Sequence, residues 1–197
     1  MQTHQRRSIR LPNFDYSSQG AYYITLVTWN RDNLFGEIVE GEMRLSDWGI
    51  ILGEEWEKTA TIRPEIELDA YQIMPNHFHA IIVIRNVRAD GCPPVPSGAH
   101  DAGAHGVAAD GVGAHGGAPR PILERKPRSL GSCIAGIKSI TTKRINLLRQ
   151  TPGTPVWQRN YYEHIIRNQE EWQRIRAYIQ ANPNNWQLDN ENPLKRQ

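Results

Sequence analysis

IMPNHFHAIIVI, residues 73–84, sets two histidines within an apolar, β-branched run that is typical of a buried strand. Because side chains alternate between the two faces of a strand, His77 and His79 point to the same side, together with Ile81. Two imidazoles on a rigid strand can hold one metal ion or one phosphate if another element approaches them. The alternative is that both histidines are hydrogen-bonded structural residues at the end of the strand.

Alternating and helical patterns around this stretch predict a mixed α+β domain. Residues 65–73 alternate apolar and charged side chains, and a turn at residues 74–76 follows, so these residues and the histidine strand are expected to form an antiparallel hairpin. Serine or asparagine caps precede the apolar stripes of the helices. We expect strands at residues 21–29, 37–43, 65–73 and 77–84, a strand or strand-like pair at 156–166, and helices at 46–60, 130–149 and 168–182.

The bulk composition favours one domain without a membrane partner. At 197 residues the chain is long enough for a single domain with a core. Hydrophobic residues make up 39% of it, no apolar run approaches the roughly 18 residues of a membrane span, and the N-terminus lacks an apolar signal core. Cys92 and Cys133 are the only cysteines, too few for a disulfide framework. We therefore expect a cytoplasmic protein.

One segment departs from the rest in composition. Residues 88–121 consist largely of Gly, Ala, Pro and His, from which no core can be built, so we expect a disordered insertion. Its repeated Gly-Ala-His tripeptides have flexible spacing, which makes their histidines poor metal ligands. The predicted organisation is a basic arm at 1–20, a catalytic domain at 21–186 interrupted by this insertion, and a tail at 187–197.

Charge is distributed unevenly, although the formal net charge is only +2. Residues 32–69 carry eleven acidic and three basic side chains, whereas residues 120–149 carry eight basic and one acidic. This asymmetry indicates a basic face for a polyanion, although a solvated helix surface explains it equally well. The cations expected to track a nucleic-acid backbone are Lys138, Lys143, Arg144 and Arg149, with Arg6, Arg7 and Arg10 as an N-terminal arm.

The last predicted helix carries a second set of polar residues. Arg174, Tyr178 and Asn182 are spaced i, i+4 and i+8 and share one face, next to an apolar stripe expected to pack on the sheet. If this helix lies near the histidine strand, its phenol and amide, with the imidazoles, can bind a divalent cation and attack a phosphodiester. Because a free phenol has a pKa near ~10, attack at neutral pH needs a base, a metal or a cation such as Arg174. The alternative is that Tyr178 is an ordinary amphipathic-helix residue and Asn182 a C-terminal cap.

Together these motifs resemble those of the single-tyrosine HUH transposases, which pair His-hydrophobic-His on a central strand with Tyr-x-x-x-Gln/Asn on a helix. The first motif is matched by MPNHFHAIIVI at residues 74–84 and the second by YIQAN at residues 178–182. The intervening segments SLGSCIAGIKSITTKRIN and VWQRNYYEHIIRN look like those of the REP-associated tyrosine transposases, and asparagine at position 182 favours the same branch. The resemblance covers residues 22–186 apart from the insertion.

The resemblance implies a fold, a site and a substrate. The fold would be a ferredoxin-like antiparallel sheet with helices packed on it, the HUH endonuclease fold. By matching position, His77, His79 and Asn182 would be metal ligands, and Tyr178 the nucleophile that forms a 5′-phosphotyrosine and frees a 3′-hydroxyl. The substrate would be single-stranded DNA beside a hairpin, as in repetitive extragenic palindromes (REP). Complete strand transfer by a single nucleophile would need a homodimer, or a monomer that reuses its tyrosine.

Residue chemistry adds to this expectation and leaves alternatives open. Tyr161 and Tyr162 offer stacking platforms for unpaired bases, and they are rival nucleophiles that lack an i+4 ligand. Mg²⁺ prefers oxygen ligands, so a two-histidine site favours Mn²⁺, while the abundance of Mg²⁺ keeps it open. A non-catalytic module that binds structured single-stranded DNA or RNA is the main alternative. A nucleotide hydrolase of the histidine-triad kind would need a third alternating histidine, where this chain has Ile81.

Overall fold

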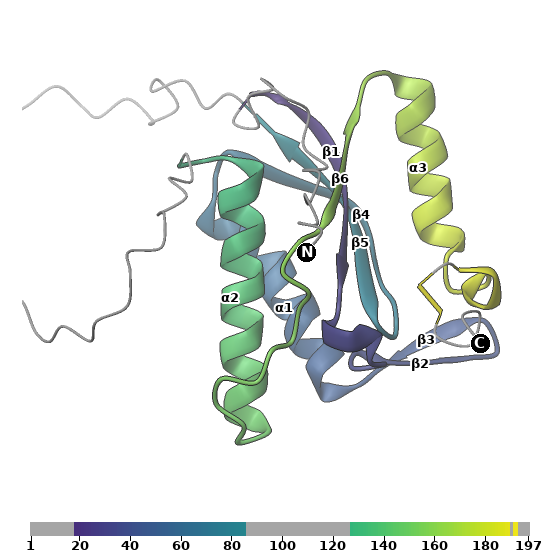
Figure 1. Ribbon diagram of the computed structural model, residues 1–197. Helices are drawn as coiled ribbons and strands as arrows, with labels where there is room; N and C mark the ends of the chain where they lie inside the picture. Colours follow the sequence, from purple (N-terminus) through teal and green to yellow (C-terminus); the bar gives the residue numbers. More distant parts are fainter. Residues whose placement is uncertain (1–17, 86–126, 190, 193–197) are drawn as a thin grey trace, which may run out of the picture.

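The computed structural model describes residues 18–85, 127–189 and 191–192 (Figure 1). The predicted insertion at 88–121 and residues 1–17 of the predicted arm lie outside the described residues. No helix in the described part of the chain combines the length and apolar composition needed to cross a bilayer.

The protein is built on a four-stranded antiparallel sheet in the order β4-β5-β1-β6 (Figure 1). The strands are β1 (Gly20–Val27), β4 (Ile66–Ile73), β5 (His77–Ile84) and β6 (Tyr162–Ile166). Helix α1 (Asp47–Ile62) connects β1 to β4 and helix α2 (Leu130–Leu148) connects β5 to β6, which is the βαββαβ order of a ferredoxin-like fold. The predicted α+β class and the central position of the histidine strand are confirmed.

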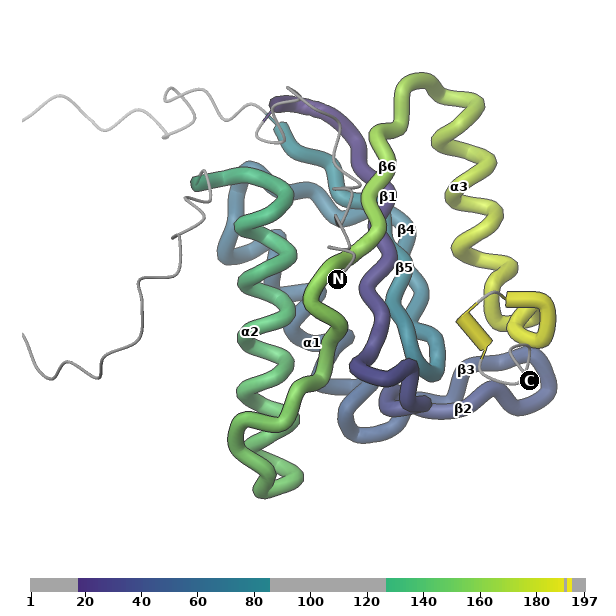
Figure 2. The backbone as a smooth tube through the Cα atoms, in the orientation of Figure 1, coloured from purple at the N-terminus to yellow at the C-terminus, as the bar shows by residue number. Residues whose placement is uncertain are grey.

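The two faces of the sheet are covered by different helices (Figures 1 and 2). Helices α1 and α2 cover one face and enclose the larger core, in which Phe78, Ala80 and Ile82 pack with residues such as Trp56 of α1. Helix α3 (Gln169–Ala181) covers the other face, where its residue Ile179 packs in a smaller cluster with Ile81. The alternation predicted for β5 therefore holds, and both histidines lie on the α3 side.

The register of β1 against β5 decides which side chains surround the histidines. Val27 pairs with His77, Thr25 with His79, and Tyr23 with Ile81. Directly paired residues of antiparallel strands point to the same face of a sheet. Tyr23 and Thr25 therefore project on the α3 side, next to the histidine pair.

The three helices begin at the predicted caps. The side chains of Ser46, Ser129 and Asn168 each accept a hydrogen bond from the backbone N–H three residues later. In the usual capping box the glutamate accepts from the backbone N–H of the N-cap residue, here Asn168. In α3, Glu171 Oε2 instead accepts from the backbone N–H of the preceding residue, Arg167, at 2.8 Å. This bond ties the first turn of α3 to the end of β6.

Two predicted strands are shorter or divided in the structure. The short strand expected at 37–43 is a hairpin of β2 (Gly36–Val39) and β3 (Glu42–Leu45), because Glu40 and Gly41 turn the chain with φ angles of 54° and 81°. Two-residue hairpin turns with both φ angles positive match the twist of the strands they join. The strand expected at 156–166 is confined to β6, and Trp157, upstream of β6, is buried in the core with only an isolated bridge to Thr28.

Helix α3 is anchored to the edge strand β4 by one carboxylate. Asp69 accepts hydrogen bonds from Trp172 Nε1 and from the Arg176 guanidinium, whose Nε lies 2.9 Å from Asp69 Oδ1. Strand β4 has a register shift between Leu68 and Tyr71, which includes Asp69. Burial raises the pKa of the Asp69 carboxyl, but the hydrogen bonds from Arg176 and Trp172 outweigh it, so the net pKa is lowered.

Asp69→Ala is expected to reduce the free energy of unfolding by about 1–2 kcal/mol, because it leaves two hydrogen-bond donors without an acceptor. The loss is no larger because solvent screens the partly exposed Arg176 guanidinium. The measurement is urea unfolding followed by circular dichroism. Glu67→Ala is the matched control on the same strand, because its pair with Arg85 is exposed, and it should cost about 0.5 kcal/mol or less. Because the folded-state pKa of Asp69 is lowered, its contribution should be present near neutral pH and fade as the pH falls below about 4. Equal losses in both variants would contradict this anchor.

Candidate functional site

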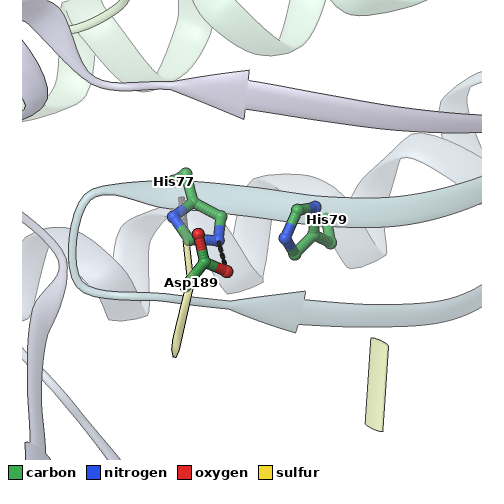
Figure 3. Close-up of side chains that lie close together, drawn as sticks. All are labelled: His77, His79 and Asp189. Carbon is green, nitrogen blue, oxygen red and sulfur yellow. Dashed lines mark ion pairs between the residues drawn. The ribbon is translucent and has the colours of Figure 1, made fainter. Parts of the chain in front are cut away.

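Two histidines of β5 and one aspartate from the C-terminal segment lie together (Figure 3). His77, His79 and Asp189 each offer one ligand atom, and these atoms lie within 4.8 Å of one another. The two imidazole rings are 4.4 Å apart at their centroids. Asp189 directly follows the short 3-10 helix η2 (Trp186–Leu188), so the site combines the central strand with the segment beyond α3.

The hydrogen bond at His77 Nδ1 fixes the tautomer of that ring. Nδ1 lies 2.8 Å from Asn76 Oδ1, while the Asn76 amide nitrogen donates to the backbone carbonyls of Arg31 and Glu191. An amide oxygen only accepts, so Nδ1 of His77 carries the proton. The lone pair of the neutral ring is therefore on Nε2, the atom that faces the site.

His79 is held in a similar way by β1. Its Nδ1 lies 2.8 Å from the Tyr23 hydroxyl and 3.0 Å from Thr25 Oγ1, and the Thr25 hydroxyl donates to the Tyr23 oxygen at 3.2 Å. Because the proton of Thr25 is directed at Tyr23, Thr25 Oγ1 is available to accept from Nδ1–H of His79. This arrangement leaves Nε2 of His79 as the second free lone pair.

Burial keeps both imidazoles uncharged. Desolvation lowers the pKa of His77 to about 3. Desolvation is also the main reason that the pKa of His79 lies well below its ordinary value, and repulsion between the two rings when both are protonated lowers it further. Neutral imidazole is the form that binds metal ions. At neutral pH the two rings are therefore in the state required of ligands.

Three buried atoms that the sequence predicts to bind a metal ion have no hydrogen-bond partner in the described part of the protein. They are Nε2 of His77, Nε2 of His79 and Oδ1 of Asn182, the residue that follows α3. Asn182 is 2% exposed, so water does not satisfy its oxygen at the surface. Leaving a buried polar atom unpaired is unfavourable, and contact with a cation would satisfy an atom of this kind. The donor set of this structure therefore fits a divalent metal.

Asp189 is the site residue that sequence reasoning missed. Its carboxylate is 6% exposed and lies 3.8 Å from Nε2 of His77, and the dashed line in Figure 3 marks this contact. Because His77 is neutral, the lone pair on its Nε2 faces the Asp189 carboxylate across this gap. A cation between the two groups would relieve their repulsion. Asp189 falls in the predicted tail at 187–197 and follows no helical or strand pattern, so no local signal marks it.

The segment around Asp189 is fixed against the site from several directions. Arg31 Nε lies 2.6 Å from Glu191 Oε2, and Asn76 Nδ2 donates to the Glu191 carbonyl at 2.8 Å. The Trp186 ring lies 5.9 Å from the ring of His77. Asn76 therefore serves both the tautomer of His77 and the position of this segment.

Tyr178 lies at the open side of the site. It is 48% exposed, and its ring is 5.4 Å from that of His79. Burial of its inner side and the nearby charge of Asp189 raise the pKa of the phenol, and hydrogen bonds with Asn182 and Tyr23 counteract part of that shift. Helix α3 packs on the histidine strand through Ile179 and Ile81, which is the condition under which the sequence placed Tyr178 near the histidines.

The residues predicted to bind DNA divide between the two sides of the sheet. Arg174 on α3 has a 73% exposed side chain, and Tyr162 on β6 is 47% exposed with its ring 6.0 Å from that of Tyr23. Both belong to the face that carries the histidines. Tyr161, by contrast, packs against the larger core.

Most predicted cations of α2 are engaged within the protein on the opposite face of the sheet. Lys138 Nζ donates to the carbonyls of Gln158 and Asn160, and burial lowers its pKa to about 8. Arg144 pairs with two carboxylates of α1, and Arg149 donates to Asn146 and to the carbonyl of Thr154, whereas Lys143 is exposed. The acidic and basic halves of the sequence therefore partly neutralise each other.

Comparison with known proteins shows a relative of this chain. No family model matches the chain. An uncharacterized protein of Haemophilus influenzae is 34% identical over 191 residues, a match that covers 94% of this chain and 92% of that protein. The two proteins belong to one family.

Among solved structures, a REP-associated tyrosine transposase bound to a REP hairpin matches with a TM-score of 0.54 and 18% identity. The match covers 90% of this chain and 74% of that one. The expected HUH transposase fold is thereby confirmed.

Asp189→Asn is expected to weaken Mn²⁺ binding by about 10- to 100-fold, the range typical when a residue that supports a metal site is removed. The measurement is isothermal titration of the full chain with MnCl₂. Glu170→Gln, an exposed carboxylate in the first turn of α3, is the control and should leave the affinity unchanged. Unchanged affinity in Asp189→Asn would exclude its carboxylate as a ligand.

Proposed function

We propose that this protein is a metal-dependent nuclease and strand transferase that nicks single-stranded DNA through a covalent 5′-phosphotyrosine, at hairpins of the REP type. The observation that carries this proposal is the set of three unpaired buried donor atoms, on His77, His79 and Asn182, beside the half-exposed phenol of Tyr178. Neutral imidazoles without a partner suit a metal ion, and an accessible phenol next to them suits covalent attack on a substrate from solution.

The metal would be held by His77, His79 and Asn182, with Asp189 adding a carboxylate oxygen. A divalent cation in such a site supplies Lewis-acid polarisation of a phosphodiester oxygen. Two imidazole nitrogens are better suited to Mn²⁺ than to Mg²⁺, which prefers oxygen ligands and keeps several waters. We therefore propose Mn²⁺ as the more effective cofactor in vitro, with Mg²⁺ as the other candidate.

The reaction assigned to Tyr178 is a transesterification. The phenol gives up its proton, its oxygen forms a bond to phosphorus, and the bond from phosphorus to the 3′ oxygen of the preceding nucleotide breaks. That 3′ oxygen takes up a proton, so the products are a 5′-phosphotyrosine and a free 3′-hydroxyl. Attack by another 3′-hydroxyl on the phosphotyrosine reverses the chemistry and joins a new strand.

A hairpin-flanked single strand is the proposed substrate, because a solved structure of this fold that matches the chain is that of a transposase bound to a REP hairpin. The exposed side chains of Tyr162 and Arg174 lie on the same face as Tyr178, where a base can stack and a phosphate can pair. We assign the α2 cations at most a secondary role in binding, since they lie across the sheet from this face. Complete strand transfer by one tyrosine requires its reuse or a second copy of the chain.

The alternative function is a non-catalytic module that binds structured single-stranded DNA or RNA. It fits the burial of the inner side of Tyr178 and the nearby charge of Asp189, which raise the pKa of the phenol and oppose formation of the phenolate. It leaves the unpaired ligand atoms of the site without an explanation.

Tyr178→Phe is expected to abolish formation of a covalent protein–DNA adduct, because phenylalanine keeps the ring and removes the nucleophilic oxygen. The assay incubates the full chain with end-labelled, hairpin-flanked single-stranded DNA and MnCl₂ and resolves the products on a denaturing gel. His77→Ala should also lose the slow-migrating band, through loss of metal binding.

His164→Gln is the matched histidine control, because His164 lies on β6 and pairs with Glu171 outside the site. It should form the adduct at the wild-type level. An adduct that persists in Tyr178→Phe would refute the assignment of the nucleophile. Tight hairpin binding without any adduct in the wild-type protein would favour the binding module.

A further inference from the structure

Asn76 directly precedes the histidine strand and is fully buried. Its side-chain oxygen lies 2.8 Å from Nδ1 of His77. Its side-chain nitrogen donates to two backbone carbonyls, that of Arg31 at 3.1 Å and that of Glu191 at 2.8 Å. One amide group therefore joins the start of β5, the 3-10 helix η1 (Trp29–Arg31) that follows β1, and the C-terminal segment that carries Asp189.

These partners allow one orientation of the Asn76 amide. Backbone carbonyls only accept hydrogen bonds, so the side-chain nitrogen must face Arg31 and Glu191. Turning the amide over would set its oxygen against two carbonyl oxygens. The side-chain oxygen is thus directed at His77 by two residues that are distant from it in the sequence, and the proton of that ring is held on Nδ1.

The backbone on both sides of this amide is also fixed. Thr28 donates to the carbonyl of Asn76 from its N–H and from its hydroxyl, each at 2.9 Å. Asn30 and Arg31 then adopt φ angles of 55° and 61°, in the left-handed region that is uncommon for residues other than glycine. Backbone of this kind persists where the surrounding contacts determine it, and it is frequent at functional sites.

The position of the Asp189 carboxylate depends on the residue that Asn76 binds. One carboxylate oxygen of Asp189 accepts from the backbone N–H of Glu191 at 2.6 Å, and the other lies 3.8 Å from Nε2 of His77. The carbonyl of Glu191 in turn accepts from Asn76. The bond between Asn76 and Glu191 therefore helps to decide where the Asp189 carboxylate meets the ring of His77.

We propose that Asn76 is a positioning residue that sets two ligands of the metal site together, His77 through its tautomer and Asp189 through docking of the C-terminal segment. This inference rests on the proposed function, since it concerns the metal site of that reaction. Asn76 is not itself a ligand, because its side-chain oxygen and nitrogen are both engaged within the protein. Its effect on the metal is exerted through the two residues that it holds.

The first measurement compares the wild-type full chain with Asn76→Ala in the absence of metal and DNA. Long-range ¹H–¹⁵N NMR correlations report the tautomer of His77, whose signals are identified by their loss in His77→Ala. Wild type should carry the proton on Nδ1, whereas Asn76→Ala should shift toward the Nε2–H form, because Asp189 is then the nearest acceptor. The backbone amides of Asp189 and Glu191 should exchange with solvent about tenfold faster in Asn76→Ala, since the segment loses a hydrogen bond.

Asn76→Asp separates the two roles. Its carboxylate can still accept from Nδ1–H of His77, but it cannot donate to the carbonyls of Arg31 and Glu191. The wild-type tautomer should be kept, while exchange at Glu191 should be faster as in Asn76→Ala. Exchange at the wild-type rate in Asn76→Asp would overturn the inference, because docking of the segment would then not depend on the amide nitrogen.

The second measurement is a double-mutant cycle of Mn²⁺ affinity, by isothermal titration of Asn76→Ala, Asp189→Asn and the double variant. Asn76→Ala should lower the affinity by about 10- to 100-fold, the range typical for residues that orient metal ligands. The double variant should lose less than the product of the two single losses, because Asn76 acts in part through Asp189. Loss of the full product would overturn the claim that Asn76 sets both ligands.

Asn146→Ala is the matched control, because Asn146 is also a buried asparagine, and its amide donates to the Thr154 carbonyl and accepts from Arg149. It should leave the His77 tautomer, the exchange at Glu191 and the Mn²⁺ affinity unchanged. A wild-type His77 with its proton on Nε2 would overturn this inference alone, without any variant. Absence of Mn²⁺ binding in the wild-type protein would overturn the proposed function and this inference with it.

Discussion

The central constraint on this structure is the burial of two uncharged imidazoles on a central strand of the sheet. His77 and His79 lose hydration on folding, and each recovers one hydrogen bond at Nδ1, from the neighbouring Asn76 and from β1. Their Nε2 atoms recover none within the protein. Such an arrangement is unfavourable for a purely structural histidine, whereas it is the state required of a metal ligand whose second nitrogen fixes the tautomer.

The rest of the fold supplies the partners of those two rings. The β1–β5 register places Thr25 directly opposite His79, and Tyr23 two residues farther along the same face. Helix α3 is held against the sheet by the bond from its Arg176 to Asp69 of β4 and by the packing of Ile179 in the smaller core. This docking fixes where the helix ends, and therefore where the Tyr178 ring lies beside that of His79.

Much of this arrangement follows from local patterns in the sequence. Period-two alternation on β5 predicted that the two histidines share one face, and the capping residues Ser46, Ser129 and Asn168 predicted where the helices begin. These features depend on neighbours within a few positions, which is why a single sequence suffices to predict them. The i, i+4 spacing likewise predicted that Tyr178 and Asn182 lie side by side.

Long-range contacts were beyond the same reasoning. Asp189 reaches the site through contacts made by Arg31 and Asn76, and no local pattern encodes those pairings. The basic helix appeared suited to a polyanion, yet Arg144 binds carboxylates of α1 that lie far away in the sequence. Charge counts along a chain do not show which opposite charges meet after folding, whereas the packing of α1 against α2 does.

Anomalous X-ray diffraction from crystals of the protein soaked in MnCl₂ tests the proposed metal site most directly. We expect a single strong manganese peak in bonding contact with Nε2 of His77, Nε2 of His79 and Oδ1 of Asn182, with Tyr178 at the open side of the ion. A peak bound elsewhere, with the three atoms still unpaired, would contradict it. So would the absence of any peak at Mn²⁺ concentrations that support DNA cleavage.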